Sequence, residues 1–247
     1  MKEDLISIIV PVYNAEKYIE ETIKNLQQQT YKNYEIIFID DKSTDRSVEI
    51  IKKYLDDNLI LIQNDKNEGP AISRNKGLDN ANGRYICFQD ADDLWEIDKL
   101  EKQLRFIKSK KCAFVYTGFK FKYKNKDKTV KIQEELTYKQ ALINMRILTI
   151  SVMFDLTKID KELLKMPDIQ NEEISTWYKI LRKGYIAYGI NEPLVTYRKT
   201  RKTRSSNKWK NFRNRWYIYK KIEKFNHIQS IYYMLCYVFF GIKKRIN

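Results

Sequence analysis

The chain has 247 residues, of which 43% are hydrophobic, enough for a substantial core in one large domain or one and a half. A single histidine, His227, argues against histidine-based catalytic triads and histidine-rich metal sites. The three cysteines are widely spaced and form no Cys-x-x-Cys pair. They therefore indicate neither a zinc site nor a disulfide framework, and they favour a reducing compartment.

The formal net charge of +15 is concentrated at the C-terminal end. From Arg198 onward the chain carries 15 lysine and arginine residues and one acid, Glu223. The first 197 residues carry 32 basic and 31 acidic residues and are nearly neutral. This asymmetry predicts an anionic partner for the C-terminal end of the chain.

Two features bear on the compartment. Residues 1–4 are polar and lead directly into an apolar run, so we expect no signal peptide. No apolar run approaches the roughly 20 residues that a membrane-spanning helix needs. The sequence therefore predicts a cytoplasmic protein.

Apolar runs and helical periodicity alternate through the first part of the chain. Strands are predicted at 5–10, 34–39, 59–63 and 85–88. Helices are predicted at 15–29, from a cap at Ser43 or Thr44 to about residue 55, and at 71–81. This alternation is typical of an α/β fold in which helices flank a mostly parallel central sheet. The Gly-x-Gly-x-x-Gly dinucleotide fingerprint is missing after the first strand.

The middle of the chain is less regular. A helix is predicted at 95–108, followed by two strands around a turn near Gly118 and a charged loop at 125–128. A helix at 137–145, a strand at 148–154, a helix from Asn171 to Gly184 and short strands at 185–190 and 194–197 complete this part.

The C-terminal region differs in composition. Residues 207–225 predict a basic helix with aromatic side chains, and the apolar residues 231–242 are followed at once by Lys243, Lys244 and Arg245. Aromatic side chains between cations suit an anionic membrane surface. The alternative is an ordinary packed pair of helices with a solvated basic face. We expect a domain at 1–200 and a basic, amphipathic helical extension at 201–247.

Three carboxylates follow the fourth predicted strand: Asp90, Asp92 and Asp93. The carboxyl end of a core strand is where open α/β sheets bind ligands. Carboxylates packed so closely repel one another unless a cation lies between them. Their hard oxygen ligands suit Mg²⁺ or Mn²⁺, which is commonly shared with a diphosphate. The alternative is a solvated acidic turn that caps the next helix.

Acidic pairs recur at three predicted sheet-edge positions: Asp40/Asp41, Asp90/Asp92 and Glu172/Glu173. With residues 67–77 (Asn-Glu-Gly-Pro-Ala-Ile-Ser-Arg-Asn-Lys-Gly), they resemble the inverting family 2 glycosyltransferases of bacterial surface-polysaccharide synthesis, which have the GT-A fold. Residues 8–14 (Ile-Ile-Val-Pro-Val-Tyr-Asn) match that family's opening strand. Residues 40–45 (Asp-Asp-Lys-Ser-Thr-Asp) resemble its Asp-Asp-x-Ser-x-Asp loop, and residues 172–177 (Glu-Glu-Ile-Ser-Thr-Trp) resemble its Glu-Asp-x-x-x-Trp motif. Order and spacing agree over about residues 5–200.

The resemblance implies a donor site for a nucleotide-sugar, with a UDP-sugar as the expected donor. The residues expected to line the base and ribose are Pro11, Tyr13, Asp40 and Asp41. Arg74 is expected to approach the nucleotide or its pyrophosphate as a cation. Asp92, with Asp90 beside it, is expected to hold Mn²⁺ or Mg²⁺ on the diphosphate.

The same resemblance places the catalytic base at Glu173, which would take a proton from the acceptor hydroxyl. The family usually has Asp at this position, so Glu172 is a second candidate, and the alternative for both is a favourable charge at a helix N-terminus. Many relatives carry a His near the metal after the last strand of the domain. Here Lys199, Thr200 and Arg201 stand in that place, and a cation could contact phosphate instead.

The expected function is metal-dependent, inverting transfer of one sugar to a glycan acceptor, lipid-linked, by an enzyme peripheral on the inner face of the cell membrane. Such transfer would serve capsule or other surface-polysaccharide biosynthesis, with no nucleic-acid partner. Processive synthases carry Gln-x-x-Arg-Trp, but Phe212 precedes Arg215 and Trp216 at the Gln position. The rival functions are a sugar-phosphate nucleotidyltransferase and a non-catalytic nucleic-acid- or membrane-binding protein. Acceptor contacts are expected between residues 119 and 149.

Overall fold

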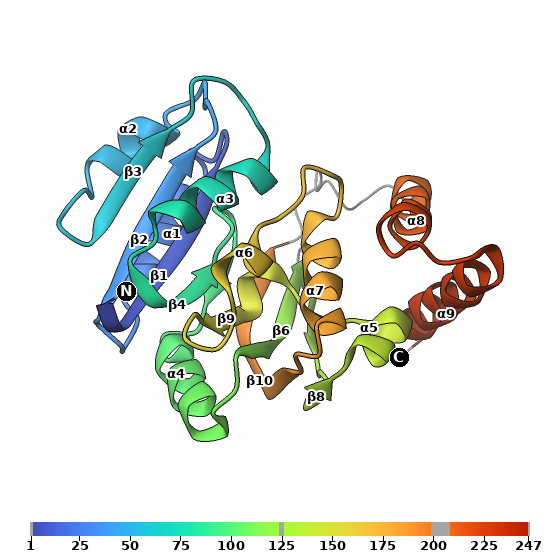
Figure 1. Cartoon of the computed structure of the whole chain (residues 1–247). Coiled ribbons are helices and arrows are strands. Elements are labelled where there is room, and N and C mark those ends of the chain that lie inside the picture. Colours follow the sequence, from blue (N-terminus) through green and yellow to red (C-terminus); the bar gives the residue numbers. More distant parts are fainter. Residues whose placement is uncertain (1, 124–125, 199–207, 247) are drawn as a thin grey trace.

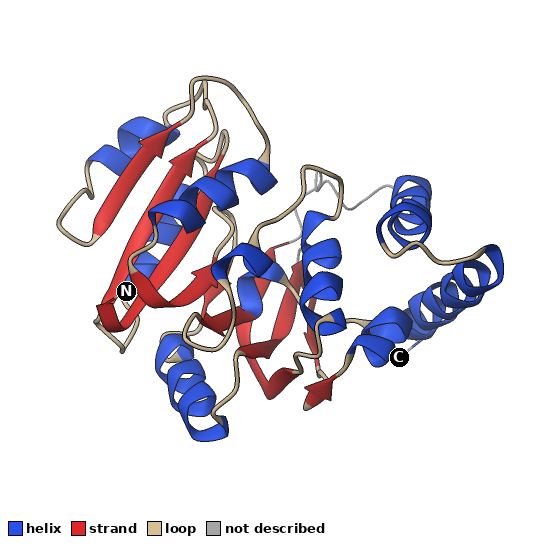
Figure 2. Ribbon diagram, viewed as in Figure 1, coloured by secondary structure: helices blue, strands red, loops and turns tan. Residues whose placement is uncertain are grey.

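The computed structural model describes residues 2–123, 126–198 and 208–246. These residues form one ten-stranded mixed sheet covered by helices, with a pair of C-terminal helices at the end of the molecule opposite β3 (Figure 1). The strands of the sheet run in the order β3-β2-β1-β4-β9-β6-β10-β5. Figure 2 shows the helices lying against the sheet, whose strands twist from one end to the other.

The first half of the sheet is parallel, as the alternating pattern predicts. Its strands are β1 (Lys2–Val12), β2 (Tyr34–Asp40), β3 (Leu59–Gln63) and β4 (Gly83–Phe88). The crossover helices are α1 (Ile19–Gln27), α2 (Ser47–Lys52) and α3 (Pro70–Asn80). Gly77 lets α3 approach the sheet, since a Cβ there would lie 2.4 Å from Ile9 Cγ2 and 2.6 Å from Ile39 Cδ1.

The second half of the sheet mixes directions. β9 (Val152–Asp155) is antiparallel to β4 and to β6 (Phe114–Tyr123), while β10 (Ala187–Arg198) is parallel to β6. β5 (Leu94–Trp95), β7 (Lys126–Val130) and β8 (Glu135–Leu136) add short antiparallel pairs. The sheet is therefore mixed and largely parallel.

The remaining helices cover the second half and form the C-terminal region. They are α4 (Lys99–Lys110), α5 (Tyr138–Asn144), the 3₁₀ turn η1 (Thr149–Ser151), α6 (Lys161–Leu164), α7 (Glu172–Arg182), α8 (Lys208–Tyr217), the π-helical η3 (Ile218–Ile222) and α9 (His227–Ile246). Thr137 and Gln140 form a capping box that explains where α5 begins.

Two predicted helix starts are wrong. Trp95 belongs to β5, because it pairs with Val195 of β10, and α4 begins only at Lys99. The Trp95 backbone N–H also donates to Asn25 Oδ1 at 2.8 Å, and its carbonyl accepts from Asn25 Nδ2 at 2.9 Å. Ser43 and Thr44 do not cap α2, which begins at Ser47. The Thr44 N–H instead donates to Asn14 Oδ1 at 2.8 Å, so it serves a contact between loops.

Two predicted strand breaks are also wrong. Gly118 lies inside β6 rather than in a turn, where its missing Cβ admits the Glu192 carbonyl; a Cβ would lie 2.9 Å from that oxygen. The strands predicted at 185–190 and 194–197 form the single strand β10, whose register shifts around Pro193. The predicted loop at 125–128 begins at a residue outside the described ones, and its remaining residues belong to β7.

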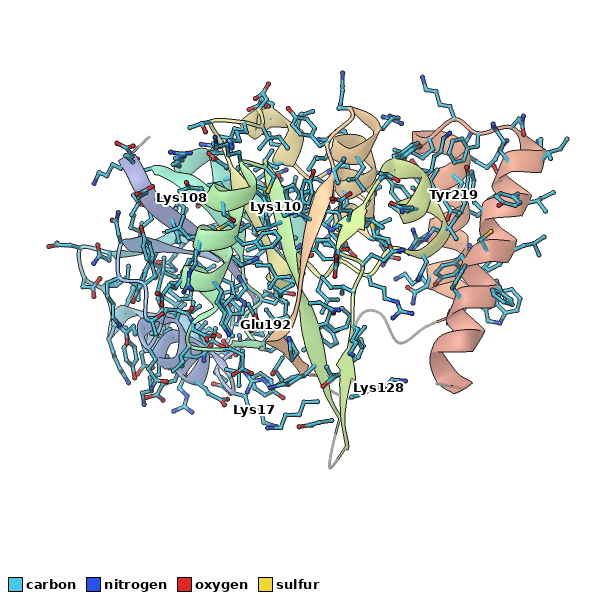
Figure 3. All side chains as sticks on the ribbon, turned by 90° about the horizontal axis from the view of Figure 1, so that it is seen from below. Lys17, Lys108, Lys110, Lys128, Glu192 and Tyr219 are labelled. Carbon is cyan, nitrogen blue, oxygen red and sulfur yellow. The ribbon has the colours of Figure 1, made fainter. Side chains whose placement is uncertain are left out.

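The C-terminal helices are packed against the body on one face. Ile218 and Tyr219 of η3 are buried, and the Tyr219 hydroxyl donates to the Leu142 carbonyl of α5 at 3.1 Å (Figure 3). The lone acid of this region, Glu223, is buried, accepts from Arg182 Nη1 of α7 at 2.8 Å, and accepts from the Tyr138 hydroxyl. The extension is thus anchored to α5 and α7 through the one carboxylate it carries.

The predicted division at residue 200 lies outside the described residues, and so do Lys199, Thr200 and Arg201, which stand where many relatives carry a His. The division stays a prediction, as does a contact between phosphate and a cation there. Among the helices that the structure describes, none is both long enough and apolar enough to span a bilayer.

Candidate active site

The acidic loop after β4 forms a tight turn at the carboxyl edge of the sheet. The Asp93 N–H donates to the Asp90 carbonyl at 3.2 Å, and Gln89 Nε2 donates to the Asp93 carbonyl at 2.6 Å. Asp90 and Asp92 are partly exposed, whereas Asp93 is fully buried. The turn therefore presents two of its three carboxylates outward and uses the third inside the protein.

Asp93 holds the end of β10. Its Oδ1 accepts from the Arg198 backbone N–H at 2.7 Å, and the Arg198 side chain donates from Nε to the Asp92 carbonyl and from Nη1 to Glu21 of α1. Arg198 also lies over the ring of Tyr18. This clamp on the acidic loop was missed from the sequence, which shows only that a cation ends the predicted strand.

Burial and mutual repulsion disfavour the charged forms of these acids. Burial, then the charge of Asp90, raises the pKa of Asp92 to about 6, and the same causes raise the pKa of Asp93 well above its ordinary value. A cation at this turn would relieve the repulsion. The described residues contain no cluster of three or more potential ligand side chains, so a Mg²⁺ or Mn²⁺ ion bound by Asp90 and Asp92 would need its other ligands from a diphosphate and water.

Arg74 of α3 joins this loop to the start of α7. Its Nη2 donates to Asp90 Oδ1 at 2.7 Å and its Nη1 donates to Glu172 Oε1 at 3.0 Å. The side chain is almost fully buried, and its Nε has no hydrogen-bond partner among the described residues. Arg74 thus fixes the positions of two acids that are 82 residues apart in the chain. Its predicted contact with the nucleotide stays a prediction.

The two glutamates that begin α7 have different surroundings. Glu172 is buried and paired with Arg74, whereas Glu173 is partly exposed and has no ion pair among the described residues. Burial, then repulsion by Glu172, raises the pKa of Glu173 to about 7, although Arg74 opposes the change. A carboxylate with a pKa near the working pH is suited to accept a proton in catalysis.

The four residues predicted around the base and ribose lie at adjacent strand ends. Pro11 pairs with Ile39, and Val12 pairs with Asp40, so the ends of β1 and β2 are side by side. Tyr13 follows β1 and is 53% exposed, so its ring is free to stack on a base.

The two aspartates after β2 are buried and hold the surrounding loops. Asp41 accepts from Asn64 Nδ2 at 2.9 Å and from the N–H groups of Glu68 and Gly69 at 2.8 and 2.7 Å. Asp40 accepts from the Ser43 N–H at 3.3 Å. Asp41 therefore shapes the loop before α3, in addition to any contact it makes with a nucleotide.

Similarity to a known protein family covers most of the parallel half of the sheet and the acidic loop. The family described as "Glycosyl transferase family 2" matches residues 7–167. The chain belongs to glycosyltransferase family 2. This membership decides for a glycosyltransferase over the nucleotidyltransferase and non-catalytic alternatives. The matched residues include Arg74 but end before α7.

Individual relatives extend the similarity over the whole chain. The Bacillus subtilis glycosyltransferase TuaG, named for teichuronic acid biosynthesis, is 38% identical over 98% of both chains. The Escherichia coli protein WfgD, named as a UDP-Glc:α-D-GlcNAc-diphosphoundecaprenol β-1,3-glucosyltransferase, is 33% identical over 99% of this chain and 96% of its own.

Solved structures show that the fold is shared by more distant proteins. Staphylococcus aureus TarS in complex with UDP-GlcNAc is similar with a TM-score of 0.73 and 21% identity, over 93% of this family 2 glycosyltransferase and 70% of that chain. The Pyrobaculum calidifontis mannosyltransferase PcManGT in complex with GDP-Man and Mn²⁺ gives a TM-score of 0.67 and 19% identity, over 93% and 69%. The predicted GT-A type of α/β fold is confirmed.

Proposed function

We propose that this glycosyltransferase carries out metal-dependent, inverting transfer of one sugar from a UDP-sugar to a lipid-linked glycan, in surface-polysaccharide biosynthesis. The observation that carries the proposal is the cluster in which Arg74 joins Asp90 of the acidic loop to Glu172, directly beside Glu173. The names of WfgD and TuaG support the donor, the acceptor and the pathway class. The Mn²⁺ in the PcManGT complex supports the metal.

The chain's own residues would act as follows. Pro11, Tyr13, Asp40 and Asp41 bind the nucleoside at the ends of β1 and β2. Asp90 and Asp92 would hold Mn²⁺ or Mg²⁺, which supplies positive charge for the departing nucleoside diphosphate.

Glu173 accepts the proton of the acceptor hydroxyl while that oxygen forms a bond to the anomeric carbon of the donor. The bond from the anomeric carbon to the diphosphate oxygen breaks in the same displacement. A single displacement inverts the anomeric configuration, and it needs no nucleophile from the enzyme. Arg74 keeps Asp90 and Glu172 in place during this step.

The direct test uses the purified full-length protein with Mn²⁺ and a panel of nucleotide-sugars, first for slow hydrolysis and then for transfer to a sugar-diphospho-lipid acceptor. We expect hydrolysis of one UDP-sugar and transfer of a single residue, with the anomeric configuration inverted by NMR. Transfer with retention would overturn the mechanism. Absence of hydrolysis and transfer for every donor would overturn the function.

The membrane part of the proposal depends on the outer face of the C-terminal helices. Large apolar side chains recur at helical spacing on α9 and are exposed; this apolar stripe consists of Ile228, Ile231, Tyr232, Leu235, Val238 and Phe239. Trp209 of α8 is 78% exposed as well. Because the region also carries almost all of the net charge, the partner that fits is the anionic inner leaflet of the cell membrane. One face of the C-terminal helices thus packs against the body, and the exposed face is the one that we propose to lie on the membrane.

The double variant Leu235→Gln/Phe239→Gln is expected to bind anionic vesicles at least about tenfold more weakly, because full burial of each side chain contributes about 1.5–3 kcal/mol. Co-sedimentation with phosphatidylglycerol-containing vesicles measures the binding. A truncation at 207 is a poorer test, since Tyr219 and Glu223 are packed against the body.

The matched control is Leu55→Gln/Ile97→Gln, which removes two exposed apolar side chains from the body. Vesicle binding by this control should equal that of the wild type. Equal losses in the two double variants, or none in the first, would show that α9 is not the membrane-binding face.

A further inference from the structure

A small cavity lies between α5, α7 and the C-terminal helices, apart from the acidic loop. It has a volume of about 100 Å³ and is lined mainly by apolar and aromatic side chains, with Leu142 and Met145 on one side and Tyr237 and Phe240 on the other. One cation, Arg215 of α8, also lines it. A guanidinium beside apolar walls in so small a cavity suits one phosphate group whose attached hydrocarbon chain continues outside it.

Arg215 is held without a carboxylate. Its Nη1 donates to the Tyr178 hydroxyl at 2.7 Å, and its guanidinium lies over the rings of Tyr178, Tyr219 and Tyr237, with 4.9 Å to the centroid of Tyr237. Among the described residues it forms no ion pair, in contrast to Arg74, Arg84, Arg182 and Arg198. A half-buried guanidinium whose charge is balanced only by ring faces and a phenol is available to an anion.

The cavity is close to the proposed base. Asn214, next to Arg215, donates to Gln170 Oε1 at 2.6 Å, so α8 lies against the segment that leads into α7. Tyr178 is five residues beyond Glu173 on α7, roughly 7.5 Å along the helix axis. Burial tends to lower the pKa of Arg215, whereas Tyr178, Tyr219, Tyr237 and Glu173 raise it.

We propose that Arg215, at this cavity, binds the phosphate next to the hydrocarbon chain of a lipid-linked sugar diphosphate acceptor. The inference rests on the proposed function. In such an acceptor the diphosphate is attached to the sugar whose hydroxyl reaches Glu173, so the anion lies one sugar away from the base, toward Tyr178. The hydrocarbon chain leaves along Tyr237 and Phe240, which are adjacent in the chain to Val238 and Phe239 of the apolar stripe.

The test compares two acceptors of the same sugar, one with a lipid diphosphate and one with a neutral alkyl group. For Arg215→Gln we expect KM for the diphosphate acceptor to rise on the order of tenfold to hundredfold, because a charge-assisted hydrogen bond is lost. KM for the neutral acceptor, donor hydrolysis and vesicle binding should stay as in the wild type. Arg215→Lys keeps the charge, so its KM for the diphosphate acceptor should lie between those of the wild type and Arg215→Gln.

The matched control is Arg213→Gln, which removes the same charge from an exposed position on the same helix. It should leave both KM values unchanged. An equal rise of KM for both acceptors in Arg215→Gln would indicate damage to the fold and overturn the inference, as would equal effects of Arg213→Gln. If Arg215→Gln does not fold, an unchanged KM ratio in Arg215→Lys overturns it.

The two proposals fail differently. If the wild type transfers to lipid diphosphate acceptors and the Arg215 variants keep the same acceptor preference, only the Arg215 site is refuted. A wild-type protein that transfers to neither acceptor would refute the proposed function and with it the inference. A preference for the diphosphate that disappears only when phosphatidylglycerol is added would assign the cavity to a membrane headgroup and overturn the acceptor site.

Discussion

Replacement of Glu173 by Gln is expected to lower the single-turnover rate of sugar transfer by a factor of about 10²–10⁴. Gln has the size of Glu but cannot accept a proton at neutral pH, so the acceptor hydroxyl would lose its base. Affinity for the donor should be kept, because Asp92 and Arg74 are unchanged. Rapid-quench transfer assays and calorimetric titration of the nucleoside diphosphate measure the two quantities side by side.

Glu172→Gln is the matched control, one residue away on the same helix turn. Glu172 is paired with the buried Arg74, so its loss leaves a buried cation with one partner fewer. We expect reduced stability from this change, with a smaller effect on the rate than Glu173→Gln. Full activity in Glu173→Gln and loss in Glu172→Gln would move the base one residue back. Full activity in both variants would remove the pair from the mechanism.

The pH dependence follows from the same group. With its pKa raised to about 7, Glu173 is the charged base only above that pH, so the rate should fall about tenfold per pH unit below it. A raised pKa also means that Glu173 gives up its proton more readily in the unfolded state, so stability falls as the pH rises from about 4.5 to about 7 and changes little above that. Glu173→Gln should therefore gain in melting temperature relative to wild type between pH 5 and pH 8. If the difference in melting temperature between Glu173→Gln and the wild type stayed the same from pH 5 to pH 8, the raised pKa would be contradicted.

Asp92→Asn is expected to abolish turnover and to weaken Mn²⁺-dependent binding of the nucleoside diphosphate at least about a hundredfold. Loss of an outer-shell partner already costs about 10–100-fold in metal affinity, and Asp92 would be a direct ligand. Isothermal titration of UDP with and without Mn²⁺ measures the effect. Stability should change little or rise, since burial and repulsion oppose the charged form of Asp92.

The control is Asp93→Asn, in the same turn. Asp93 is buried and accepts from the Arg198 backbone N–H, a bond that an Asn carbonyl can also accept. Its Mn²⁺-dependent affinity should therefore stay close to wild type. Unchanged affinity in Asp92→Asn, or an equal loss in Asp93→Asn, would show that the ion is not held by Asp92.

The local pattern of apolar residues was sufficient to predict the parallel half of the sheet. The apolar runs that became β1 to β4 are separated by helical periodicity, and a chain with that alternation has few ways to bury both faces of its strands. Polar residues directly after such strands must then gather at one edge of the sheet. For this reason the sequence by itself predicts Asp40 and Asp90 at one edge of the sheet, whereas the role of Tyr13 came from the family resemblance.

Contacts between distant segments do not follow from the same pattern. Periodicity reports that a residue is buried but not which residues it contacts, so Trp95 was predicted to begin a helix although it pairs with Val195 of β10. Gly118 was predicted in a turn, although its missing Cβ admits the Glu192 carbonyl of a neighbouring strand.

Only the tertiary structure decided the different surroundings of carboxylates that look alike in the sequence. In the sequence Glu172 and Glu173 are equivalent neighbours, and Glu223 is one acid among many cations. Folding pairs Glu172 with Arg74, leaves Glu173 without an ion pair among the described residues, and buries Glu223 against Arg182. The energy of a charge depends on burial and on partners far away in the chain, so composition determined how many charges this protein has, and the three-dimensional packing decided what each of them can do.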